Sequence, residues 1–211
     1  MKDKTQKQRK LSKAELKRKA EFEALSEKLL AEGYRPNHMI MSVAKANVLG
    51  IIAPLPFIIL FIILYFARGN EYITLEGKNM AIVLLAFVVL IVVHELIHGI
   101  TWACFAKTGW KSISFGFIVA YLTPYCSCNE PMKKYQSILS ALMPTLLLGF
   151  IPCAVAVFTG SSVLLAIGIL MILGGGGDLL IIFMLLRYKS PSKDVLFIDH
   201  PYELGTAVFE K

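Results

Sequence analysis

Long uninterrupted apolar runs are the feature of this 211-residue sequence that most restricts its fold. Four runs, at about residues 46–67, 80–106, 137–158 and 162–186, each reach the twenty or so residues that a helix needs to cross a bilayer. Hydrophobic residues make up 56% of the chain, against about 45–50% in an average protein. Because this excess is concentrated in the runs, we expect a polytopic membrane protein with four transmembrane helices.

Basic residues are distributed unevenly around these runs. Twelve of the 22 Lys and Arg lie in residues 1–45, and the second loop and the C-terminal tail carry four each. The first loop has only Arg68 and Lys78, offset by Glu71 and Glu76, and the third loop has none. Because cytoplasmic segments are enriched in Lys and Arg, both termini and the second loop are predicted to be cytoplasmic, in a multi-pass protein of the cell membrane.

The basic N-terminal segment also bears on the choice of partner. Next to membrane spans, such a segment is typical of contact with anionic membrane lipid. The formal net charge of +7 could also indicate nucleic acid, but the sequence lacks a recognition motif and interleaved aromatic residues. We therefore expect a lipid contact and no nucleic acid partner.

Three segments follow from these patterns: a basic cytoplasmic segment (1–45), a four-span membrane domain (46–186) and a cytoplasmic tail (187–211). In the first segment, Ser12 and Glu15 form a capping-box pattern and Gly33 is a stop signal, which predicts an amphipathic helix over about residues 13–32. Its apolar face is formed by Phe22, Leu25 and Leu29. This helix either lies on the membrane or packs on the protein.

Residues 112–125 are too apolar for an ordinary loop and too short for a span. Apolar and small residues alternate in this stretch, which predicts strands. Unpaired strand edges cannot face lipid, so we expect a hairpin held against protein or lining a cavity. The tail predicts two more short strands, at 195–198 and 206–209. The expected class is thus an all-α polytopic membrane protein with a small β-hairpin segment on the cytoplasmic side.

The second run contains the sequence HELIH at residues 94–98. His94 and His98 are four residues apart, so a helix places both imidazoles on one face, at the spacing that zinc requires. Glu95 adjoins them, where it can take a proton from a zinc-bound water and pass it to a leaving amine. Buried polar packing is the alternative, but so many ionisable groups are costly in a bilayer, which favours Zn²⁺ binding.

A catalytic zinc usually has three protein ligands and one open position. The metzincin pattern would continue with glycine at position 101 and histidine at position 104, but this chain has Thr101 and Cys104. Outside HELIH, Asp178 is the only acidic residue in a predicted span. Asp178 is therefore the candidate third ligand, and its alternative role is a hydrogen bond to another helix.

Depth in the membrane supports this choice. His98 precedes Lys107 by nine residues, and Asp178 precedes Arg187 by nine. At a rise of 1.5 Å per residue, both lie about 13 Å from the basic residue that marks the inner boundary. The glycines at 174–177 either let the fourth span approach the second closely or let the helix unwind there.

Other polar residues are weaker candidates for the metal. Cys126 and Cys128 could bind it as a pair, although Cys-x-Cys alone is a poor signal. Glu130 is expected to be a loop cap or a turn residue rather than a ligand, and Cys104 is at the wrong helical angle from His98. The remaining histidines, at positions 38 and 200, are predicted to be turn or surface residues.

The sequence HELIHG, the ISFGF stretch, the YCSCNEPM segment, the proline-containing third run and the DHP tail are similar to a family of bacterial proteins described as zincin membrane peptidases. More distantly, the chain resembles the site-two type of intramembrane metalloprotease. The resemblance covers about residues 80–211 and implies that His94, His98 and Asp178 bind zinc and that Glu95 is the catalytic acid and base. Two departures from the site-two pattern are a leucine after Asp178, in place of glycine, and no accessory peptide-binding domain.

The sequence thus predicts a zinc-dependent, membrane-embedded peptidase that cleaves a peptide or membrane-protein substrate near the cytoplasmic membrane surface. An extended substrate could pair with the edge of the hairpin or of a tail strand. A non-catalytic membrane protein with a structural or regulatory zinc is the second hypothesis, and Glu95 discriminates between the two because a structural site needs no general base. A metal-ion carrier is the third, although its polar residues would be distributed through the spans and here they share one depth.

Overall fold

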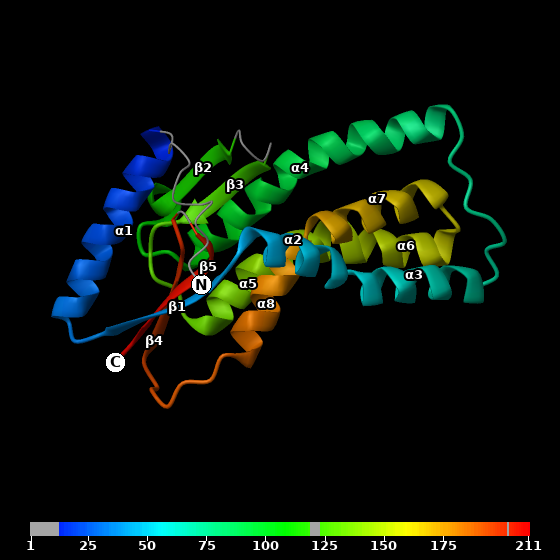
Figure 1. Ribbon diagram of the computed structural model, residues 1–211. Helices are drawn as coiled ribbons and strands as arrows, with labels where there is room; N and C mark the ends of the chain where they lie inside the picture. The colour runs from blue at the N-terminus through cyan, green and yellow to red at the C-terminus, as the bar shows by residue number, and fades with distance from the viewer. Residues whose placement is uncertain (1–12, 119–122, 202) are drawn as a thin grey trace.

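A computed structural model describes residues 13–118, 123–201 and 203–211 of the chain (Figure 1). Long helices extend toward one end of the molecule, and the strands and helix α1 (Lys13–Ala31) gather at the other. The described C-terminal residue lies at the strand end, beside the N-terminal part of the described chain.

Three helices in the described residues are long and apolar enough to cross a membrane. They are Val43–Ala67, made of α2 (Val43–Ile52) and α3 (Leu55–Ala67); α4 (Lys78–Phe105); and Lys134–Thr159, made of α5 (Lys134–Thr145), the π-helical segment η4 (Leu146–Phe150) and α6 (Ile151–Thr159). A fourth results if α7 (Ser162–Gly174) and α8 (Gly176–Arg187), which meet at an angle of 53°, form one span. Of the four predicted runs, three are therefore single membrane-length helices and the last is a bent pair.

Helices α3, α6 and α7 pack together at the end far from the strands. Their shared core includes Tyr65, Cys153 and Leu165, all nearly fully buried. Gly160 adopts a left-handed conformation (φ 71°) that ends α6, and its carbonyl accepts a hydrogen bond of 2.7 Å from the Tyr65 hydroxyl. The short turn makes α6 and α7 an antiparallel pair, as the sequence predicts (Figure 1).

The glycines at positions 174–177 break the last apolar helix and let its second half pack closely against other helices. Helix α7 ends at Gly174, and α8 begins at Gly176 in a new direction. A Cβ atom on Gly176 would lie 1.8 Å from the carbonyl oxygen of Gly50 in α2, and one on Gly175 would lie 2.1 Å from Oγ1 of Thr145 in α5. The close partners of these glycines are therefore the first and third spans, whereas the sequence hypothesis named the second.

The two ends of the chain form one structural unit, which we call the terminal lobe: α1 and strands β1 (Arg35–Met41), β4 (Val195–Asp199) and β5 (Leu204–Glu210). The strands form an antiparallel sheet in the order β1-β5-β4. Leu29 of α1 packs with Ile198 and Phe209 of the sheet, joined by Phe22 and Leu25. Of the two alternatives for the amphipathic helix, the structure therefore has the one in which it packs on the protein. Strand β1 was not predicted, and the class is mostly helical with two small sheets.

The predicted hairpin is confirmed and lies between α4 and the terminal lobe. Strands β2 (Ile113–Ile118) and β3 (Thr123–Cys128) follow a 3₁₀ turn, η2 (Gly109–Ser112), and pair antiparallel with Phe115 opposite Cys126. After the hairpin, Met132 exchanges backbone hydrogen bonds of 2.8 Å with Phe197 of β4. This bridge ties the hairpin segment to the sheet and leaves a cavity between α4, α8, β3 and β4.

Candidate metal centre

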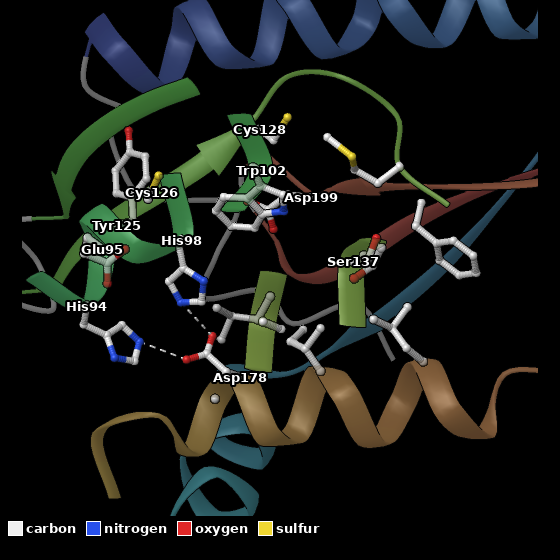
Figure 2. Close-up of a pocket in the computed structure, with 18 of the residues that line it drawn as sticks. His94, Glu95, His98, Trp102, Tyr125, Cys126, Cys128, Ser137, Asp178 and Asp199 are labelled. Carbon is white, nitrogen blue, oxygen red and sulfur yellow. Dashed lines mark hydrogen bonds and ion pairs between the residues drawn. The ribbon is translucent and has the colours of Figure 1, made fainter. Parts of the chain in front are cut away.

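Two helices bring together the three residues that the sequence proposes as metal ligands (Figure 2). His94 Nε2 lies 3.0 Å from Asp178 Oδ2, and His98 Nε2 lies 3.4 Å from Asp178 Oδ1. One ligand atom from each of the three residues lies within 4.8 Å of the other two. Both histidines are buried, so the cluster is shielded from solvent on the α4 side.

The ring of His98 is oriented from two sides. Its Nδ1 lies 2.8 Å from the carbonyl oxygen of Ser140 in α5, and because a carbonyl only accepts, Nδ1 carries the proton, which leaves Nε2 as the atom that can bind a metal when the ring is neutral. Trp102, one helical turn further along α4, stacks on the ring with centroids 5.2 Å apart. The hydrogen bond to Ser140 fixes the tautomer of His98, and the stacked Trp102 ring helps to hold the orientation of the imidazole.

The Ser140 carbonyl is available because of a proline. In an α-helix it would accept from the backbone N–H four residues later, but that residue is Pro144, which has none. The third span thus leaves one carbonyl oxygen without its helical donor at the depth of the histidines. Sequence reasoning noted the proline but missed this consequence.

Asp178 owes its position to the bend between α7 and α8. Helix α8 starts at Gly176, so Asp178 lies in its first turn, where the helix dipole favours a negative charge. From there its carboxylate reaches both histidines with separate oxygens. A straight helix through the glycine run would present this side chain in another direction.

Glu95 lies beside the cluster without belonging to the three-residue group. Its side chain is half-buried and lines the same cavity, where the carboxylate interacts with the backbone of Cys126 in β3 (Figure 2). This is the arrangement expected of a proton carrier next to a metal, since the residue faces the space that a substrate would fill.

The cavity beside the cluster has a volume of about 350 Å³. Its walls come from α4, β3, α5, the α7–α8 bend, β4 and β5. The charged side chains among the described lining residues are acidic: Glu95, Glu130, Asp178 and Asp199. Neither Lys nor Arg is among them, so the cavity has an acidic lining.

The alternative ligands are placed differently. Cys126 and Cys128 line the cavity but are not in the metal-binding group found among the described residues. Burial raises the pKa of both thiols, which disfavours the thiolate form that binds metals. Cys104 is exposed on α4. Glu130 accepts hydrogen bonds from the backbone N–H groups of Lys107 and Thr108, so the expected loop cap is confirmed.

The two remaining histidines lie in the terminal lobe, outside the metal cluster. His38 is exposed but belongs to strand β1, not to a turn. His200 lies in the connection between β4 and β5, where the sequence predicts a turn, but it is not at the surface: it is only 7% exposed, with its ring centroid 5.3 Å from that of Phe22. The apolar face of α1 covers it, a contact that the local sequence could not reveal.

One further charged pair at the cavity was missed by sequence reasoning. Asp199, at the end of β4, pairs with Arg18 of α1 at 3.0 Å. Burial raises the pKa of Asp199, and the Arg18 guanidinium opposes that shift. The two residues are 181 positions apart, and their meeting depends on the assembly of the terminal lobe.

The donor set fits a zinc ion. Two imidazole nitrogens and one carboxylate oxygen converge from separate elements beside an open cavity, which is the ligand pattern of catalytic zinc sites. Fold and site together define a helical protein with membrane-length apolar helices and a cluster of two histidines and one aspartate that could hold a metal ion.

The chain belongs to the family described as "putative zincin peptidase", whose sequence profile matches residues 87–193, or 107 of the 211 residues. The matched region includes both histidines, Glu95 and Asp178. No curated protein and no solved structure matches the chain.

Proposed function

We propose that this protein is a zinc-dependent peptidase embedded in a membrane, and that it hydrolyses a peptide bond near the cytoplasmic membrane surface. The observation that carries the proposal is the convergence of His94, His98 and Asp178 at one wall of a cavity that Glu95 also lines. Family membership supports the same chemistry.

In this proposal His94, His98 and Asp178 hold the zinc, and Glu95 moves the proton. Zinc, when bound, lowers the pKa of water and polarises the carbonyl group that is attacked. Glu95 takes the proton of the attacking water at its carboxylate and returns it to the leaving amine. Ser140 and Trp102 keep the His98 ring in the orientation that its role requires.

Exposed apolar side chains support a membrane setting. On α4 the face away from the cluster carries Leu85, Val88 and Val92, each more than 60% exposed. Such a continuous apolar surface is costly in water and is the surface that lipid covers. The cavity lies where the helices meet the strands, which suits hydrolysis near a membrane surface better than at the bilayer centre.

The strands that line the cavity favour an extended peptide as the substrate, either free or part of a membrane protein. Strand β3 pairs with β2 on one side only, so it has a second edge near the cavity, whereas Met132 occupies the second edge of β4 at Phe197. A peptide that added to the edge of β3 would pass Glu95 and the cluster.

A structural zinc is the second candidate. A structural site is closed by four protein ligands, whereas three ligand residues and an open cavity favour catalysis. Glu95 also has no task at a structural zinc, because it lies outside the ligand group.

Metal analysis of detergent-purified protein, followed by a peptidase assay, tests the proposal. We expect one zinc per chain in the wild type and its loss in His94→Ala and His98→Ala. Glu95→Gln should retain the zinc but cleave peptides about 10²–10⁴-fold more slowly, because only proton transfer is removed. Wild-type protein free of transition metal would refute the metal site, and an active Glu95→Gln would refute the role of the base.

A further inference from the structure

The acidic lining of the cavity leaves one carboxylate without a role in the proposed chemistry or in the α4–β3 part of the wall. Asp178 faces the histidines, Glu95 is the proposed base, and Glu130 accepts backbone hydrogen bonds at the end of α4. Asp199 remains. It lines the site cavity and also a small gap beneath α1.

The partner of Asp199 comes from outside the cavity. Arg18 Nη2 lies 3.0 Å from Asp199 Oδ2, and the guanidinium lies 5.0 Å from the centre of the Tyr125 ring. Arg18 lines the gap beneath α1 but not the site cavity, and its side chain is only 11% exposed. An arginine from α1 is therefore inserted between two residues of the cavity wall, one in β4 and the other in β3.

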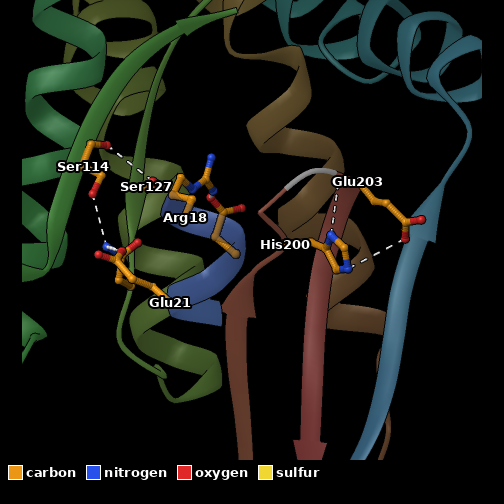
Figure 3. Close-up of polar contacts among 8 residues, drawn as sticks. Arg18, Glu21, Ser114, Ser127, His200 and Glu203 are labelled. Atoms are coloured by element: carbon orange, nitrogen blue, oxygen red, sulfur yellow. Dashed lines mark hydrogen bonds and ion pairs between the residues drawn. The ribbon is translucent and has the colours of Figure 1, made fainter. Parts of the chain in front are cut away.

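The two halves of α1 are held in different ways. Its C-terminal half is anchored by Leu29 in the apolar core of the terminal lobe. Its N-terminal half is held by polar contacts: the Arg18–Asp199 pair and a hydrogen bond of 2.8 Å from Asn129 to Glu21 (Figure 3). The Asp199 side chain remains 39% exposed and lines the cavity, so its carboxylate is accessible to a second charged group besides the buried Arg18.

We propose that Asp199 recognises a basic side chain of the peptide substrate and that Arg18 occupies this position when no substrate is bound. The inference rests on the proposed function and extends it to a substrate class: peptides with a lysine or arginine near the cleaved bond. Arg18 is then an internal competitor, and the N-terminal half of α1 yields as the substrate side chain displaces it.

The acidic walls and the aromatic ring favour such a substrate. A cation in this position would have the Asp199 carboxylate as its hydrogen-bonding partner and the Tyr125 face beside it, as Arg18 now has. An acidic peptide would instead meet like charges from several wall residues.

Peptide binding to the full-length Glu95→Gln protein in detergent provides the test, because binding is measured without cleavage. The probes are fluorescent peptides that are identical except for one lysine or one norleucine, placed in turn at each position. In this background we expect Arg18→Gln to bind the best lysine peptide about tenfold more tightly, since the competitor is gone, with the norleucine peptide unchanged. Asp199→Asn should abolish the lysine preference. Lys28→Ala, which removes an exposed charge from the same helix, is the matched control and should change neither.

A purely structural ion pair predicts different results. Arg18→Gln would then lower the thermal unfolding temperature without tightening the binding of the lysine peptide, and that result overturns the inference, as does the absence of binding to either peptide. The charge swap Arg18→Asp/Asp199→Arg restores the contact between α1 and the wall even if the single variants are unstable. We expect the swapped protein to lose the lysine preference, whereas retention of the preference would contradict the recognition role. Zinc content and cleavage by the wild type are measured separately, so failure here leaves the proposed function standing.

Discussion

At the scale of single residues, two aspartates in one cavity are expected to behave differently. Asp178 lies within 3.4 Å of both histidine Nε2 atoms, whereas Asp199 pairs with Arg18. Asp178→Ala should therefore lose most of the zinc, because two histidines hold the ion poorly, and Asp178→Asn should weaken binding because an amide is a poorer ligand. Asp199→Asn is the matched control and should keep full zinc occupancy. Plasma emission analysis of the purified proteins gives the answer, and a zinc-replete Asp178→Ala would show that the third ligand lies elsewhere.

Pro144 is expected to affect the metal without touching it. Alanine at this position supplies the missing N–H, which then competes with His98 for the Ser140 carbonyl. Loss of such a second contact typically weakens metal binding about 10–100-fold. Competition with a zinc chelator measures the effect in Pro144→Ala. Pro152→Ala, in α6, is the control and should leave the affinity unchanged, since Pro152 is remote from the histidines.

Single residues of the site could be predicted unequally well from sequence. His94 and His98 follow from a spacing that a helix places on one face, and Asp178 follows from being the only acidic residue in a predicted span outside HELIH, supported by the depth match of nine residues. The contribution of Ser140 could have been inferred from Pro144, because a proline always frees the carbonyl four residues before it. The Arg18–Asp199 contact could not, since it joins residues 181 positions apart through tertiary packing alone.

At the scale of elements, the start of α8 depends on Gly176. An added Cβ would meet the backbone oxygen of Gly50 at 1.8 Å, and a backbone atom cannot move aside as a flexible side chain could. Gly176→Ala should separate α2 from α8, cost about 1–3 kcal/mol of stability, and reduce zinc binding by displacing Asp178.

Gly177→Ala is the matched control for this effect. A Cβ at Gly177 meets nothing within 4 Å, so the variant should unfold at the wild-type temperature and retain its zinc. Thermal unfolding and metal content of the two alanine variants are compared side by side. Equal behaviour would mean that the close approach of α2 and α8 is not needed for the site.

The elements also show where local sequence stops being informative. The hairpin is confirmed because its alternating residues predict strands by themselves. Strand β1 was missed because its sequence, RPNHMIM, has no clear alternation, and it becomes a strand by pairing with β5. The glycine run left a close approach and an unwound helix as alternatives. The helix does break there, but the close approach is to the first and third spans rather than to the second, since glycine removes the side chain and relaxes the backbone at the same position.

At the scale of the whole molecule, the terminal lobe is expected to weaken in acid. Burial lowers the pKa of His200 to about 4, helped by the charges of His38 and Arg18, against about 6.5 in the unfolded chain. Between these values the unfolded state binds a proton that the folded state excludes, so stability falls as the pH drops from about 6.5 to about 4. The contribution amounts to about 3 kcal/mol across that range.

His200→Gln tests this dependence. A glutamine can still accept from the Glu203 N–H, as His200 Nδ1 does at 3.0 Å, but it does not titrate (Figure 3). Thermal unfolding of the variant should therefore depend less on pH between about 6.5 and 4 than that of the wild type. Curves of equal slope would mean that other groups control the acid sensitivity.

The uneven distribution of basic residues predicts one orientation of the molecule in the membrane. The terminal lobe and the hairpin lie at one end of the helices, and the loop between α3 and α4 lies at the other (Figure 1). Basic residues are concentrated in the segments at the strand end, so we expect this end, with both termini, to face the cytoplasm. Single cysteines at Glu71 in that loop and at Lys193 before β4, both exposed, report on the two sides in a protein whose four native cysteines are replaced. A membrane-impermeant thiol reagent added to intact cells should label position 71 and leave position 193 unlabelled until the cells are opened. Labelling of position 193 in intact cells would show that the orientation is the reverse, with the proposed cleavage site at the outer membrane surface.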